Sequence, residues 1–247
     1  MQFSISFIVL TLVTYLNKME VGLSKFIVIE GLIGVGKTSL CRLLKEKRKA
    51  RLILEPAEDN PFLVHFYSQQ DRFAFPTQMF YLATRSEQQY RLQQMQLFSD
   101  LCVADYIFEK DQLFAEHTLT GDELELYFQF STLLARQIAV PKFILFLDAP
   151  THVIQERISN RAIQAEQEIR DEYLDELRSR YYTLWKNYDK APVYVMDTTL
   201  IDYINNPDHA EYILDIIDGW LNDTPDPRAP EAYQGETDMQ IPLFNMI

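Results

Sequence analysis

The residues with the clearest chemical signature are the glycines, the lysine and the threonine of the segment EGLIGVGKTS. Their order fits the pattern G-x-x-x-x-G-K-[ST], in which a glycine-rich turn brings backbone N–H groups close to a polyphosphate. Lys37 supplies a positive charge for the β- and γ-phosphates, and Thr38 offers a hydroxyl to Mg²⁺. We therefore expect this turn to bind ATP through Gly31, Leu32, Ile33, Gly34, Val35, Gly36, Lys37, Thr38 and Ser39.

The segments around this turn are of the kind that a phosphate-binding turn requires. The apolar run 26–29 predicts a buried strand before it, and SLCRLLKEK predicts an amphipathic helix whose N-terminal dipole faces the anion. Further strands are predicted at 51–54, 101–104, 142–147 and 193–196, and helices at 39–47, within 60–94, at 123–138, at 151–161, up to 184 and at 208–221. This alternation predicts an α/β fold of the phosphate-loop NTPase type, with a parallel five-stranded sheet flanked by helices.

Glu55 follows directly after the predicted strand 51–54. Ligands of open α/β sheets bind at the carboxyl ends of the strands, so a carboxylate there could accept a proton from an attacking hydroxyl. The alternative is a solvated surface glutamate, and position alone does not separate the two interpretations.

Gln78 and Arg85 lie seven residues apart in a helical pattern rich in aromatic residues. That spacing is two helical turns, so both side chains project from one face. Polar groups on an otherwise apolar face cost free energy if they are buried unpaired, which favours a planar polar ligand such as a nucleobase. For either residue alone, the exposed edge of a core helix is the alternative.

Length and composition indicate one central domain with tails. The chain has 247 residues, 47% of them apolar, and a formal charge of −13, which argues against a nucleic-acid surface. Cys41 and Cys102 lie in apolar patterns, which favours buried thiols in a reducing, cytoplasmic setting. We expect an N-terminal extension at 1–24, a domain at 25–222 and a disordered, acidic, proline-rich tail at 223–247.

Both ends of the chain carry further hydrophobic signals. The apolar run 3–16 is short for a bilayer and lacks the basic region of a secretory signal, so no stable membrane insertion is expected. We interpret it as a start-site artefact, with translation from Met19, or as a disordered arm; a membrane-associating segment is the alternative. At the other end, QIPLF resembles peptides that dock on the bacterial replication sliding clamp, but the interpretation we prefer is that its Leu243 and Phe244 pack on the domain.

Seven segments in order resemble the deoxyribonucleoside kinases, and in particular the bacterial deoxyguanosine/deoxyadenosine kinase branch. They are EGLIGVGKTS, EPAEDNPFLVHFY, FAFPTQMFYLATR, ADYIFEKDQLFA, RISNR, EYL and IDYINNP. The resemblance spans about 25–221 and implies ATP-dependent phosphorylation of the 5′-hydroxyl of a deoxynucleoside, with Mg²⁺, giving the monophosphate in nucleotide salvage. It also implies a helical lid and a homodimer formed through the long helices.

The same resemblance assigns roles to individual residues. Lys37, Glu55 and Arg161 would be catalytic, with Glu55 as the base and Arg161 as the first arginine of the lid. The remaining assignments are the sugar 3′-hydroxyl for Tyr67 and Glu172, the nucleobase for Gln78, Arg85 and Asp111, and Mg²⁺ for Thr38 and Asp105. An Arg85/Asp111 pair resembles kinases that accept purines or deoxycytidine, and we expect a purine deoxynucleoside, with deoxycytidine as the alternative.

Three positions depart from the family pattern. Tyr106 stands where an arginine near the transferring phosphate is common, and Ile163 replaces the second lid arginine. Asp148 stands where many other phosphate-loop enzymes hold Mg²⁺, and we interpret it as a helix cap before Thr151.

Two other functions are alternatives for a chain with this phosphate loop. A nucleoside-monophosphate kinase of similar fold needs a basic site for the acceptor's phosphate, and Glu55 has the wrong sign for that. A non-catalytic, kinase-like scaffold predicts loss of Lys37, Thr38 or Glu55, and all three are present.

Overall fold

The structure is a computed structural model that describes residues 25–55, 59–66, 69–95, 101–134, 138–161, 163 and 166–235. The predictions for the N-terminal extension, for Tyr67 and for QIPLF lie outside these residues. Among the described residues, no helix combines the length and apolarity needed to cross a membrane.

Five parallel strands form one sheet in the order β2-β3-β1-β4-β5, which confirms the predicted α/β fold. β1 lies in the middle, paired with β3 on one side and β4 on the other, so the turn that follows β1 leaves the centre of the sheet. The strands are β1 (Lys25–Gly31), β2 (Arg51–Ile53), β3 (Leu101–Ala104), β4 (Ile144–Asp148) and β5 (Val193–Asp197).

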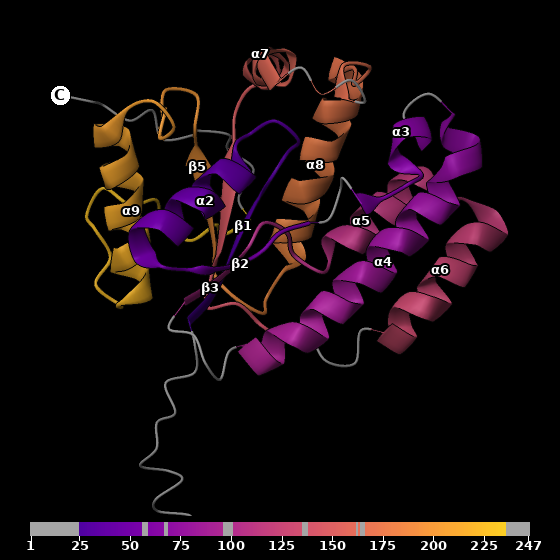
Figure 1. Cartoon of the computed structure of the whole chain (residues 1–247), viewed down its shortest axis with the longest axis horizontal. Coiled ribbons are helices and arrows are strands. Elements are labelled where there is room, and N and C mark those ends of the chain that lie inside the picture. The colour runs from indigo at the N-terminus through magenta and orange to yellow at the C-terminus, as the bar shows by residue number, and fades with distance from the viewer. Residues whose placement is uncertain are drawn as a thin grey trace, which may run out of the picture.

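Helices cover both faces of the sheet (Figure 1). α2 and α9 lie on one side, whereas α4, α5 and α6 gather on the other and pack on one another. α8 packs on the sheet through Tyr181 and Trp185, whose rings lie 5.1 and 5.5 Å from that of Phe146. The helices are α2 (Lys37–Arg48), α3 (Leu63–Phe66), α4 (Gln70–Met95), α5 (Lys110–Thr118), α6 (Gly121–Leu134), α7 (Thr151–Arg161), α8 (Asp171–Asn187) and α9 (Pro207–Leu221).

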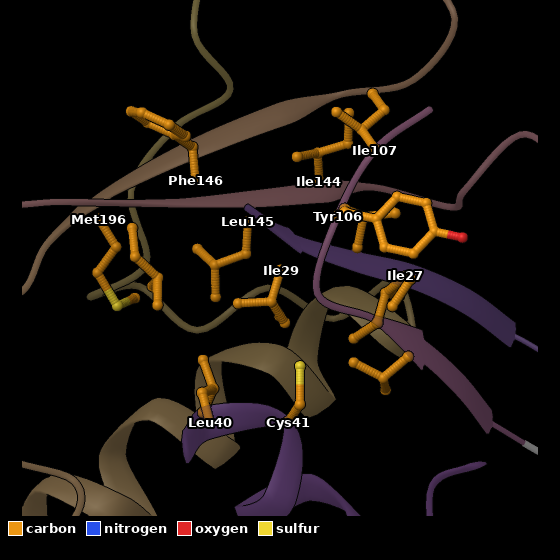
Figure 2. Close-up of a cluster of buried hydrophobic side chains, with 14 of the residues drawn as sticks. Ile27, Ile29, Leu40, Cys41, Tyr106, Ile107, Ile144, Leu145, Phe146 and Met196 are labelled. Atoms are coloured by element: carbon orange, nitrogen blue, oxygen red, sulfur yellow. The ribbon is translucent and has the colours of Figure 1, made fainter. Parts of the chain in front are cut away.

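The core lies on both faces of β1 and β4, as expected for a parallel sheet covered by helices on each side. Figure 2 shows Ile27, Ile29 and Leu145 directed toward Leu40 and Cys41 of α2. On the same strand β4, Ile144 and Phe146 point to the opposite face. All of these residues are buried, so the sheet that carries the functional turn is fixed from both sides.

The segment 223–235 differs from the disordered tail that its composition predicts. The Tyr233 N–H donates to the Val193 carbonyl oxygen at 2.7 Å, and Ala232 forms an antiparallel bridge with Tyr194 of β5. The Tyr233 ring also lies 5.8 Å from the ring of Tyr182. β5 is an edge strand, so its unpaired backbone groups and neighbouring aromatic rings give this acidic segment a surface on which to pack.

Candidate active site

The phosphate loop, residues 31–38, joins the end of β1 to the start of α2. Gly36 precedes the helix with φ = 113°, a conformation that other residues rarely adopt, and a Cβ atom there would lie 2.2 Å from the Tyr203 hydroxyl. A Cβ atom on Gly31 would lie 2.4 Å from the backbone oxygen of Leu147 in β4. The two glycines therefore let the loop fold closely against its neighbours, with its amides at the N-terminus of α2.

Lys37 closes the loop on itself. Its Nζ donates to the carbonyl oxygens of Gly31 at 2.8 Å and Leu32 at 2.9 Å. Burial and the nearby charge of Lys110 together lower the Lys37 pKa to about 8, against the opposing effect of Glu30 and Asp105. The ammonium thus lies in a site where an anion would stabilise its charged form.

Asp105 connects the ends of β2 and β3 to the first turn of α2. It follows β3, and its Oδ2 accepts from the Thr38 hydroxyl at 2.8 Å while its Oδ1 accepts from the Glu55 N–H at 2.7 Å. Burial raises the Asp105 pKa, whereas Thr38 and Lys37 pull it down. A hydroxyl and a carboxylate that converge in this way are the hard oxygen donors that suit Mg²⁺, which usually takes one or two carboxylates together with phosphates.

Glu55, just beyond β2, is engaged by two cations. One carboxylate oxygen accepts from Arg85 of α4, and the other lies 3.1 Å from Lys110 Nζ of α5. Arg85 also pairs with Asp111, and both side chains are buried. The structure therefore brings Glu55, Arg85 and Asp111 together, as the resemblance implies.

The nucleobase candidates line one side of this cluster. The Arg85 guanidinium lies between two aromatic rings, 4.9 Å from the Tyr81 centroid and 5.1 Å from the Tyr106 centroid. Gln78 is buried on the same helix and donates to the Thr118 hydroxyl at 3.1 Å. The interpretation of Gln78 and Arg85 as surface-exposed residues on the edge of a core helix is wrong, because both are buried.

The two arginines of α7 have different environments. Arg161 ends the helix, is about half exposed and pairs with Glu166 at 3.2 Å. Arg157 donates to the Val35 carbonyl oxygen at 3.1 Å and to the Thr198 carbonyl oxygen at 2.6 Å. Arg157 therefore holds the backbone of the phosphate loop and of Thr198 in place, whereas the side chain of Arg161 remains accessible near the phosphate loop.

Asp148 does not have its predicted role, and Glu172 lies apart from the ion-pair cluster. Asp148 does not act as a cap for α7; its Oδ2 accepts from Arg178 at 2.6 Å and from the Tyr182 hydroxyl at 2.6 Å. Glu172 lies exposed in the first turn of α8 and, among the described residues, takes no part in the ion-pair cluster.

Sequence reasoning missed Lys110 and Glu30. Lys110 is buried next to Glu55, and Glu30 is buried in β1 with its carboxylate 3.7 Å from Lys110 Nζ. One signal was available: Lys110 and Phe114 are one helical turn apart, and the ammonium lies 5.4 Å from that ring.

These features define a phosphotransferase of the phosphate-loop type with a cluster of buried and partly buried charged side chains, Glu55, Arg85, Lys110 and Asp111, at the ends of its strands. Residues 27–222 match the family described as deoxynucleoside kinase. The chain belongs to the deoxynucleoside kinase family and is an enzyme that phosphorylates deoxynucleosides at the expense of ATP.

Individual relatives agree with this assignment. The chain is 33% identical to deoxyguanosine kinase of Bacillus subtilis over 199 residues, which cover 76% of this chain and 93% of the relative. It is 27% identical to deoxyguanosine kinase of Lactobacillus acidophilus, covering 87% and 98% of the two chains. The structure of deoxyadenosine kinase from M. mycoides with bound dATP has a similar fold, with a TM-score of 0.67, 22% identity, and 78% and 99% coverage.

Proposed function

We propose that this enzyme transfers the γ-phosphoryl group of ATP to the 5′-hydroxyl of a purine deoxynucleoside, deoxyguanosine or deoxyadenosine, with deoxycytidine as a second candidate. The observation that carries the proposal is that the Glu55 carboxylate contacts the Arg85–Asp111 pair, while the Glu55 N–H donates to Asp105, which also accepts from Thr38 of the phosphate loop. The names of the relatives support the purine, since those compared include deoxyguanosine and deoxyadenosine kinases. The product would be a deoxynucleoside monophosphate for nucleotide salvage.

The phosphate side of the site would act mainly by positioning and by neutralising charge, which is what phosphoryl transfer needs. The loop amides and Lys37 would hold the β- and γ-phosphates. Thr38 and Asp105 would hold Mg²⁺, which when bound neutralises charge on the phosphate oxygens. Arg161 would close on the transferring group from the end of α7.

The acceptor side would orient the 5′-hydroxyl and take its proton. Glu55 would accept that proton while the hydroxyl oxygen attacks phosphorus. Two buried polar atoms, Arg85 Nε and Asp111 Oδ2, have no hydrogen-bond partner among the described residues, so they are suited to the edge of a nucleobase. With Gln78 on the same side, this set would recognise the base, and Glu172 and Tyr67 would hold the sugar 3′-hydroxyl.

The assembly and cellular setting belong to the same proposal. We propose a homodimer formed through α4 and α6, because α6 carries four exposed apolar side chains: Leu126, Phe130, Leu133 and Leu134. The ATP requirement and the buried side chains of Cys41 and Cys102 support a cytoplasmic enzyme. Docking of QIPLF on a sliding clamp remains a hypothesis for the part of the chain beyond 235.

The test is phosphorylation of each of the four deoxynucleosides by ATP and Mg²⁺, with Glu55→Gln in parallel. We expect turnover to be fastest with a purine, and Glu55→Gln to lower kcat by about 10²- to 10⁴-fold, because a general base contributes about that much. Glu87→Gln is the matched control, since Glu87 is exposed on α4 and pairs only with Arg91 among the described residues. Full activity in Glu55→Gln would remove Glu55 as the base, and faster turnover with thymidine than with either purine would overturn the substrate assignment.

A further inference from the structure

Lys110 is a charged side chain in an almost fully buried position. It is 5% exposed, its Nζ lies 3.1 Å from Glu55 Oε2, and the same atom lies 3.7 Å from Glu30 Oε1. A buried ammonium needs compensation by opposite charge, and these two carboxylates provide it. The carboxylates of Glu30 and Glu55 differ in their other hydrogen-bond partners, and this difference indicates which of them Lys110 holds in place.

Glu30 is satisfied without Lys110. Its Oε1 accepts from the Gly31 N–H at 3.0 Å and from the Tyr181 hydroxyl at 3.0 Å, and its Oε2 accepts from the Ile107 N–H at 2.9 Å. Three neutral donors therefore hold this carboxylate between β1, α8 and the residues after β3. Lys110 is not required to fix Glu30.

Glu55, by contrast, depends on its cations. Among the described residues its carboxylate oxygens bond only to Arg85 and Lys110. Arg85 is shared with Asp111 on the nucleobase side, so Lys110 is the partner of Glu55 on the other side. The charge of Lys110 also lowers the pKa of Lys37 in the phosphate loop, so the ammonium that contacts Glu55 also acts on the ATP-binding lysine.

Tyr106 does not supply this positive charge. Its ring packs on the Arg85 guanidinium, and its hydroxyl donates to Gln88 Oε1 at 2.6 Å. The position where the family commonly carries an arginine is therefore used here to hold Arg85. A cation beside the nucleophile has to come from another residue.

We propose that Lys110 is a positioning residue for phosphoryl transfer, and that it provides beside Glu55 the positive charge absent at Tyr106. This inference rests on the proposed role of Glu55 as the base. Lys110 would fix the orientation of the Glu55 carboxylate toward the 5′-hydroxyl.

In the transfer step one proton moves and one bond to the γ-phosphorus replaces another. Glu55 takes the proton of the 5′-hydroxyl, the oxygen forms a bond to the γ-phosphorus, and the bond from that phosphorus to the β-phosphate oxygen breaks with its electron pair leaving on ADP. Lys110 neither gains nor loses a proton. When Glu55 becomes neutral, Glu30 remains as the counter-ion of Lys110, so the buried ammonium is never left unpaired.

The experiment compares Lys110→Met, Lys110→Arg, Glu55→Gln and the double variant Glu55→Gln/Lys110→Met in the full chain. We expect Lys110→Met to lower kcat by about 10²-fold, the scale on which loss of positioning acts, with KM for ATP and the deoxynucleoside changed less than threefold. Lys110→Arg should recover at least a tenth of the wild-type kcat. Because Lys110 acts through Glu55, the double variant should be no slower than Glu55→Gln alone.

Lys190→Met is the matched control, because Lys190 is an exposed lysine that pairs with Glu109, the residue next to Lys110. It should keep wild-type kcat. If Lys110→Met melts below the assay temperature, Lys110→Gln gives the same comparison with a smaller change in polarity. A folded uncharged variant with kcat within threefold of wild type would overturn the inference, and so would multiplicative losses in the double variant. Absence of turnover in the wild type with all four deoxynucleosides would instead contradict the proposed function itself.

Discussion

Two aspartates follow the strands on either side of β1, and their surroundings give them different chemistry. Asp105, after β3, accepts only from the Thr38 hydroxyl and the Glu55 N–H among the described residues, so its charge is not cancelled by a direct ion pair. Asp148, at the end of β4, is neutralised by Arg178 and also accepts from Tyr182. Mg²⁺ prefers a carboxylate with its charge available, which favours Asp105.

Asp105→Asn should therefore raise the Mg²⁺ concentration at half-maximal rate by about tenfold or more, on the scale that changes around metal sites produce. The amide can still accept from Glu55, so the fold around β2 should survive. The measurement is the phosphorylation rate as a function of free Mg²⁺ at saturating ATP. Asp148→Asn serves as the comparison: it should lower Tm, because it leaves Arg178 without its partner, and leave the Mg²⁺ dependence unchanged. If Asp148→Asn changed the Mg²⁺ dependence and Asp105→Asn did not, the metal would be assigned to Asp148 at the end of β4 instead.

At the scale of the element, α7 joins parts of the ATP site that come from distant places in the sequence. Besides its bonds to Val35 and the Thr198 carbonyl, Arg157 donates to the Thr198 hydroxyl at 3.0 Å. One guanidinium thus ties the helix to the phosphate loop and to the residue that follows β5. Arg161 lies one turn further along the helix, and among the described residues its half-exposed side chain forms an ion pair only with Glu166.

We expect Arg157→Met to raise KM for ATP by about tenfold and to lower Tm, since charge-assisted hydrogen bonds contribute about 1.5–3 kcal/mol each when intact. Arg161→Met should act differently, lowering kcat with little change in Tm, because its side chain is half exposed and pairs only with Glu166 among the described residues. Steady-state kinetics and thermal melts of both variants separate the two roles. Arg180→Met, which removes an exposed pair on α8, is the control. Equal effects of Arg157→Met and Arg161→Met would contradict this division.

Helices and strands could be predicted where the hydrophobic pattern is local, but the partners of individual side chains could not. The helix at 151–161 has the predicted bounds, and the five strands were predicted because each is a short apolar run. Lys110 escaped notice because its partners Glu30 and Glu55 lie 80 and 55 positions away in sequence and meet it only when β1, β2 and α5 are assembled. Asp148 was misinterpreted for the same reason, since Arg178 approaches it from α8. Position after a strand singled out Glu55 and helical spacing singled out Arg85, and the resemblance assigned their roles, but no local pattern could pair them.

At the scale of the whole molecule, α6 presents an apolar face that the described chain does not cover. Leu126, Phe130, Leu133 and Leu134 are between 41% and 56% exposed, and they recur at the three- and four-residue spacing of one helical face. Tyr90 of the neighbouring helix α4 is also exposed. Contiguous apolar surface of this kind on a protein with a formal charge of −13 is typical of an interface between subunits.

Phe130→Glu should therefore separate the proposed homodimer into monomers. Burying a carboxylate in an apolar interface without a partner costs several kcal/mol, and about 3 kcal/mol weakens association by about 10²-fold. Sedimentation velocity over a range of protein concentrations measures the change, with Leu200→Glu as the control because Leu200 is an exposed apolar residue outside α4 and α6. Each protomer carries Glu55, Arg85, Asp105 and Lys110 in its own chain, so the monomeric variant should retain turnover at saturating substrate. The proposed interface would be contradicted if the wild-type enzyme were a monomer, or if Phe130→Glu formed a dimer of wild-type affinity.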